Sequence, residues 1–152
     1  MQLFTQTNKN LFNTAILLLR LMTGLILFVA GAGKVMGWFG GFGIHTTVDM
    51  FKSGMNIGPL WAYISSYTEF IGGFLIMLGL LTRPAAFTLF INMLVATIVS
   101  GTKNFFMGGA AYPCLLMVCN LVILLTGPLL YSIDALLFHK KDLPLTYKSQ
   151  LA

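Results

Sequence analysis

Charged side chains are scarce in this sequence of 152 residues. Asp, Glu, Lys and Arg make up 9% of it, and only four of these residues are acidic, whereas soluble domains carry about 25% charged residues. Apolar residues make up 57%. This balance excludes an ordinary soluble domain and predicts one integral membrane domain with no soluble domain attached. The net charge of +5 comes without a basic stripe interleaved with aromatic residues, so no nucleic-acid partner is expected.

The residue types that build redox and metal centres are also scarce. The two cysteines, Cys114 and Cys119, form neither a Cys-x-x-Cys pair nor a disulfide framework, which argues against a dithiol relay. No pair of histidines falls within an apolar segment, so haem or metal ligation inside the membrane has no support. His45 is expected in an interfacial loop rather than at a metal. We therefore expect no metal site and no cofactor bound by a clear motif.

Apolar runs of helical length predict an all-α fold, a four-transmembrane-helix bundle in antiparallel up-down order with short interfacial helices. The first run resembles a signal peptide, because Ala30-Gly31-Ala32 could mimic a cleavage site. However, Arg20 interrupts it, and at about 1.5 Å per residue it is long enough to cross a bilayer, so we expect an uncleaved helix. The predicted spans are residues 14–36, 59–81, 84–100 and 113–127, with amphipathic helices at 44–55 and after Ser132.

Loop cations predict the orientation of the bundle. The chain divides into an N-terminal segment (1–13), the four-helix membrane domain (14–138) and a polar tail (139–152). With the N-terminus inside, the inner side holds most of the cations, and the positive-inside rule then places both termini in the cytoplasm. The inner cations are Lys9, Arg83, Lys140, Lys141 and Lys148, and the outer ones are Lys52 and Lys103.

One carboxylate, Glu69, lies inside the second predicted span. A charge in hydrocarbon is costly and usually faces a partner or a cavity, so Glu69 is a candidate functional residue. Gly72 and Gly79 share its helical stripe, and such small residues let a neighbouring helix approach closely. A matching stripe in the first span holds Arg20, Gly24, Leu27, Gly31 and Lys34.

We predict that Glu69 is ionised and paired with Arg20 or Lys34. Depths counted along the helices place Asn92 near the level of Arg20, and Asn120 near that of Glu69. The prediction is therefore a polar seam of these residues with Lys34 at its mouth. The alternative is that the seam only holds the helices together, because structural ion pairs also occur inside bundles.

Four stretches of the chain resemble the DoxX family over residues 14–138. DoxX proteins are four-helix proteins of the bacterial inner (plasma) membrane, and the family name comes from a subunit associated with thiosulfate:quinone oxidoreductase. The resemblance thus implies a multi-pass inner-membrane protein related to oxidoreductases. The chain departs from the family pattern at two positions. Ala111 precedes Tyr112 where the family has an acidic residue, and Leu129 follows the Gly-Pro pair where the family tends to have a second glycine. The matching stretches are Arg20…Gly31-x-x-Lys34, Glu69-x-x-Gly72-Gly73…Gly79-Leu-Leu-Thr-Arg83, Asn92-Met-Leu-Val-Ala96 and Gly127-Pro128…Ser132-Ile-Asp134.

Three functional hypotheses follow. The first is a quinone-linked oxidoreductase subunit, or membrane component of a redox complex, whose soluble or membrane partner carries the redox cofactor. The second is a non-enzymatic assembly or chaperone-like membrane protein, and the third is a small transporter with Glu69 as its proton-coupling carboxylate. Expected partners are membrane lipid, the redox partner and further copies of the chain. The first hypothesis assigns catalytic roles to Glu69, Arg20 and Lys34 and quinone-binding roles to Arg83, Asn92 and Asn120.

Overall fold

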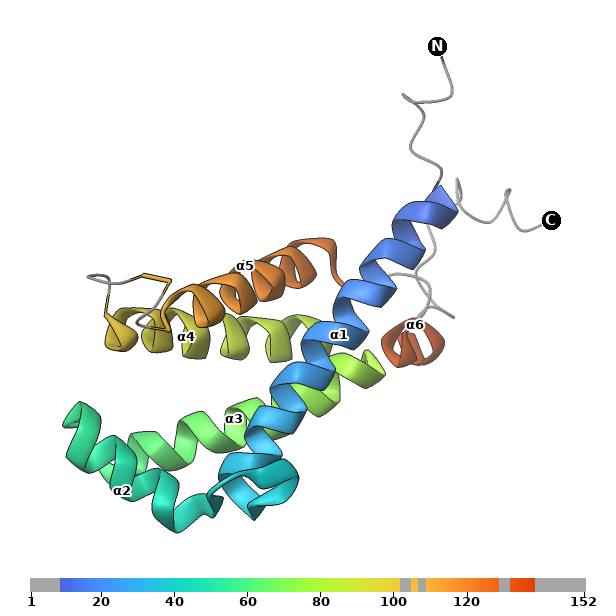
Figure 1. Ribbon diagram of the computed structural model, residues 1–152. Helices are drawn as coiled ribbons and strands as arrows, with labels where there is room; N and C mark the ends of the chain where they lie inside the picture. The colour runs from blue at the N-terminus through green and yellow to red at the C-terminus, as the bar shows by residue number, and fades with distance from the viewer. Residues whose placement is uncertain (1–8, 102–104, 107–108, 129–131, 139–152) are drawn as a thin grey trace.

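The computed structural model describes residues 9–101, 105–106, 109–128 and 132–138, and every regular element in these ranges is a helix (Figure 1). This confirms the predicted all-α class. The polar tail predicted for 139–152 and the predicted outer cation Lys103 lie outside the described ranges. The helices are α1 (Lys9–Met36), the 3-10 turn η2 (Trp38–Gly40), α2 (Gly43–Met55), α3 (Pro59–Leu78), α4 (Thr82–Ser100), α5 (Ala111–Thr126) and α6 (Ile133–Phe138).

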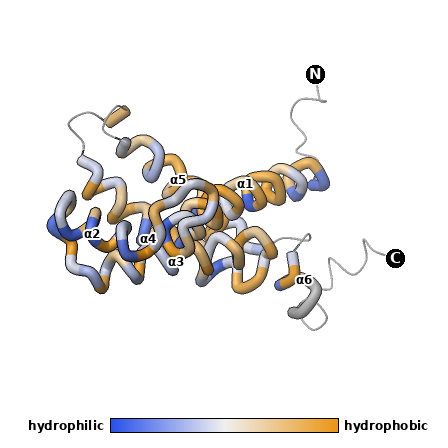
Figure 2. Tube along the Cα trace, turned by 60° about the horizontal axis from the view of Figure 1, so that its bottom comes forward, coloured by the Kyte–Doolittle hydropathy of each residue, from blue (hydrophilic) through white to orange (hydrophobic). Residues whose placement is uncertain are grey.

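Two of the described helices, α1 and α4, are long and apolar enough to cross a membrane, and α5 is apolar but shorter. Figure 2 shows apolar residues along most of α1, with hydrophilic residues at its first turn. Only 39% of the apolar window of α1 and 28% of that of α4 is buried inside the protein. Much of their apolar surface therefore faces outward, as lipid-exposed helices require. A bundle with four crossings stays a prediction.

Helices α1 and α3 run antiparallel in close contact, and glycines set their separation. A Cβ atom added to Gly24 would lie 2.7 Å from Met77 N, and one added to Gly31 would overlap the backbone of Phe70. From α3, Gly73 meets the backbone of α1 in the same way, whereas the sequence pattern had pointed to Gly72. Gly72 instead faces Leu89 of α4, whose side chain lies 3.0 Å from its would-be Cβ.

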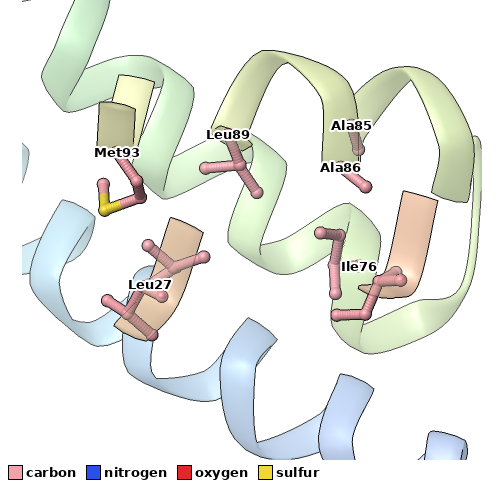
Figure 3. Packing of buried hydrophobic residues seen from close by; sticks show 8 residues of the cluster. Leu27, Ile76, Ala85, Ala86, Leu89 and Met93 are labelled. Carbon is pink, nitrogen blue, oxygen red and sulfur yellow. The ribbon is translucent and has the colours of Figure 1, made fainter. Parts of the chain in front are cut away.

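The second helix pair, α4 and α5, packs against the first through a shared apolar core. Figure 3 shows Leu27 of α1, Ile76 of α3 and Leu89 of α4 among the buried side chains of this core. The buried cluster consists of Leu27, Ile76, Ala85, Ala86, Leu89, Met93, Leu116 and Ile123.

The connection between α3 and α4 is short and tightly hydrogen-bonded. Gly79 takes φ 69° and donates its N–H to Ile76 O at 3.1 Å, while Leu80 N–H donates to Leu75 O at 3.0 Å. This is the Schellman arrangement, which favours glycine at the left-handed position. It ends α3 at Leu78, so the predicted end at 81 is too late.

A carboxylate from α6 caps the start of α4. Leu81 has φ 48°, and its N–H donates to Asp134 Oδ1 at 2.8 Å. The N–H and Oγ1–H of Thr82 both donate to Asp134 Oδ2 at 2.8 Å. Asp134 therefore does for α4 what an N-cap side chain does within one helix. Thr82 is the first residue of α4 and donates to this cap.

Leucine at Gly31 or at Gly73 should destabilise the protein, because each would force α1 and α3 apart. We expect a loss of about 1–3 kcal/mol or more, the usual cost of overpacking. The matched control is Gly54→Leu in α2, where nothing lies within 4 Å of an added Cβ. Thermal unfolding in detergent measures the three variants. Equal midpoints for Gly31→Leu, Gly73→Leu and the control would mean that these glycine faces do not set the α1–α3 contact.

Candidate functional site

Glu69 is paired with Lys34 and lies inside the protein. Lys34 Nζ donates to Glu69 Oε1 at 2.7 Å and to Oε2 at 2.6 Å. Asn92 Nδ2 adds a third donor to Oε1 at 3.3 Å and also lies 3.5 Å from Ser65 O. The Glu69 side chain is 4% exposed and that of Lys34 33%. Hydrogen bonds from Lys34 and Asn92 therefore replace the water that the Glu69 carboxylate has lost, whereas the Lys34 side chain stays partly exposed.

The helix pair α1–α3 creates this contact. Gly31 lets the α1 backbone approach α3 beside Glu69 and Phe70, and Lys34 follows one turn later, in the last turn of α1. A cation there is also favoured by the helix dipole. Thr47 Oγ1 of α2 donates to Gly43 O at 2.8 Å and lies 3.3 Å from Lys34 O. This contact holds the start of α2 against the end of α1, beside the ion pair.

The ion pair stands in the wall of a cavity of about 830 Å³. All five of the longer helices contribute to its lining, and most of the lining side chains are apolar. Lys34, Glu69 and Asn92 are its charged or amide groups, and Ser65, Thr68, Thr88, Ser100 and Tyr112 add hydroxyls. The apolar walls include Leu27, Phe51, Met55, Trp61, Phe87, Ile91, Val95 and Leu116.

Arg20, which the sequence placed in the seam beside Glu69, belongs to a different site. Its Nη1 donates to Pro128 O at 3.0 Å, and it interacts electrostatically with Asp134. A Cβ atom on Gly79 would lie 2.9 Å from Arg20 Cζ. Arg20 is 3% exposed and lies at the α3–α4 turn.

The register of α1 against α3 explains the difference. Arg20 and Lys34 are fourteen residues apart, about 21 Å along one helix. α1 begins at Lys9, not near Thr14, and its first turns extend past the end of α3 (Figure 1). A depth counted from the start of the apolar run therefore placed Arg20 too close to Glu69.

Two other predicted residues also lie apart from the ion pair. Arg83 is exposed, and its Nε lies 3.0 Å from where a Cβ of Gly127 would be. Asn120 is fully buried and donates from Nδ2 to Leu116 O at 2.8 Å. Its Oδ1 has no hydrogen-bond partner in the described part of the chain. Neither residue lines the cavity, so their roles in quinone binding, like the catalytic roles, stay predictions.

The sequence pattern missed several residues of both sites. Asp134 had been noted only in the stretch Ser132-Ile-Asp134, and no local signal indicates that its carboxylate caps α4, which begins 52 residues earlier in the chain. Trp61 and Tyr112 line the cavity but have no spacing that points to it. In the described ranges, no group of three or more His, Cys, Asp or Glu side chains could hold a metal ion.

The fold and the site together define a class: an all-helical protein with apolar helices of membrane length and a charged pair at a largely apolar cavity. A family model described as DoxX matches residues 15–102. The chain is also 34% identical over 134 residues to "Putative oxidoreductase CatD" of Bacillus subtilis (strain 168), covering 88% of this chain and 94% of that protein. This chain belongs to the DoxX family. No solved structure matches it.

Removing one member of the Lys34–Glu69 pair should cost more stability than removing both. Lys34→Met leaves the buried carboxylate without its main partner. A fully buried pair loses about 3–5 kcal/mol in this way, and because Lys34 is one-third exposed we expect about 2 kcal/mol. Adding Glu69→Gln should restore much of the loss. Thermal unfolding in detergent gives the cycle, with the exposed Lys52→Met as the control cation. Additive losses in the double variant would show that the two charges do not interact.

Proposed function

We propose that this protein is a multi-pass membrane component of a quinone-linked redox system, and that it binds a quinone headgroup at the Lys34–Glu69 pair. The observation that carries the proposal is the position of this pair in the wall of a largely apolar cavity of about 830 Å³. Small-molecule sites are commonly apolar clefts with a few placed polar groups. A quinone has this combination, a polar ring with two carbonyl oxygens on an apolar body. The name of the relative in Bacillus subtilis and the family membership support a redox role.

The polar groups of the cavity suit both the oxidised quinone, which needs a hydrogen-bond donor, and the reduced hydroquinone, which needs an acceptor. Lys34 has three ammonium donors and directs two contacts to Glu69, which leaves a donor for a carbonyl oxygen. The Asn92 amide donates to Glu69 Oε1 and holds the carboxylate beside this donor. Glu69 would accept from a hydroquinone hydroxyl and hold a proton during turnover. The electrons would come from a partner protein that carries a redox group.

Four crossings and cytoplasmic termini complete the proposal. The antiparallel α1–α3 pair and the short α3–α4 turn support alternating directions along the chain. At about 1.5 Å per residue, the 19 residues of α4 reach ~28 Å. This is close to the ~30 Å of a hydrocarbon core.

The other two hypotheses use the same residues differently. A proton-coupled transporter would need Glu69 to change protonation as a solute passes, and would give proton-dependent flux in proteoliposomes. An assembly or chaperone-like protein would associate with its partner without a ligand in the cavity. Quinone binding that depends on the ion pair separates the first hypothesis from both.

Tryptophan fluorescence tests quinone binding directly. The chain has two tryptophans, so Trp38→Phe leaves Trp61 in the cavity lining as the reporter. Titration with menadione, a quinone without a tail, should quench Trp61 saturably. The double variant Lys34→Met/Glu69→Gln should weaken this binding by about tenfold or more, because it removes the headgroup partners. Lys52→Met should leave it unchanged. Equal affinity with and without the pair would contradict the proposal.

Reporter fusions test the topology. Fusions at Asp49, at Arg83, at Lys103 and at the C-terminus should report outside, inside, outside and inside, because the predicted inner side carries most of the cations. An outward C-terminus would contradict four crossings.

A further inference from the structure

A second hollow adjoins the cavity on the outer side of α3 and α4. It has a volume of about 440 Å³, and its lining is largely apolar. Ile64, Thr68 and Thr88 line both hollows. The two spaces therefore meet at these side chains, and the cavity continues as a surface groove.

The groove runs along the α3–α4 pair, past the level of Glu69, as far as the α3–α4 turn. On α3 it runs from Ile64 to Leu75, eleven residues or about 16 Å of helix. It ends beside Leu81 and Pro84 at the α3–α4 turn. Gly72, which has no side chain to fill the space, forms part of its lining.

The groove is open to its surroundings along this length. Ile71 is 52% exposed and Leu81 51%, so apolar side chains border it on the outside. In a membrane this side of the helices meets lipid. A molecule lying in the groove could thus keep its polar end in the cavity and its apolar end against the bilayer.

We propose that the groove holds the prenyl tail of a long-tailed quinone whose headgroup lies at the Lys34–Glu69 pair; this rests on the function proposed above. The tail passes between Thr68 and Thr88 and lies along α3 toward Leu81. The substrate class is thereby narrowed to membrane-resident prenyl quinones. The groove is continuous with the charged headgroup site. One molecule with a polar head and an apolar tail can fill both spaces, whereas a separate bilayer acyl chain would fill only the groove. In lipid the gain from the tail comes from close packing, because water expulsion no longer contributes.

The test compares two quinones on one protein. Purified Trp38→Phe protein in mixed micelles is titrated with menadione and with menaquinone carrying several isoprene units, each expressed as mole fraction in the micelle. The tail should strengthen binding by about tenfold, because it adds packing in the groove. Ile71→Phe, which adds bulk to a side chain that lines the groove and not the cavity, should remove this gain and leave menadione binding unchanged. Leu75→Phe, at the far end of the same stretch of α3 and likewise absent from the cavity lining, serves as the second variant. Ile98→Phe is the control, because Ile98 is exposed on α4 and lines neither hollow.

The outcomes separate the groove from the headgroup site. Pair-dependent menadione binding with no gain from the tail would overturn the groove assignment and leave the proposed function standing. A tail gain that survives both Ile71→Phe and Leu75→Phe would also overturn it, since the tail would then lie elsewhere or the groove would hold a bilayer acyl chain. Absence of saturable binding by both quinones would overturn the proposed function itself.

Discussion

The contact between Lys34 and Glu69 is the interaction on which this account depends. A carboxylate that is 4% exposed has lost most of its hydration, and this cost is repaid only by a close partner and well-placed hydrogen bonds. The protein supplies both through the glycine-mediated approach of α1 to α3 and through Asn92 of α4. Three helices are thus tied to one charge, and the same charge faces a largely apolar cavity.

The ends of the α1–α3 contact carry two different electrostatic sites. At one end, Lys34 is partly accessible and meets a cavity. At the other end, Arg20 is buried and donates to Pro128 O. There the carboxylate of Asp134 accepts hydrogen bonds from the backbone of Leu81 and from the backbone and hydroxyl of Thr82. The Arg20–Asp134 site has the features of a structural lock, because its groups are buried and hydrogen-bonded within the protein. The Lys34 site has a spare ammonium donor and open space, which a binding site requires.

The helices, the membrane class and candidate partners of Glu69 could be predicted from the sequence. Apolar runs, helix-breaking Gly and Pro residues and helical stripes are local signals that need no knowledge of the fold. Lys34 was identified on this basis, whereas Asn92 was assigned to the seam by counting depth, near the level of Arg20; both do contact Glu69. Arg20 and Asn120 were assigned to the same seam by counting depth along separate helices, and this failed because depth depends on the register between helices. Register here follows from Gly31 and Gly73 meeting backbone, and from α1 extending past the end of α3. The cavity lies among the five longer helices and the groove lies along α3 and α4, and no periodicity within one helix encodes such spaces.

Infrared difference spectroscopy of Glu69 gives the most direct test of the central claim. The spectrum of the wild type minus that of Glu69→Gln, recorded in detergent at neutral pH, should show the bands of an ionised carboxylate. Addition of menaquinone should shift these bands, because the headgroup shares the hydrogen bonds of the Lys34–Glu69 pair. The carbonyl band of a protonated carboxylic acid in the resting protein, or carboxylate bands that do not respond to the quinone, would contradict the account.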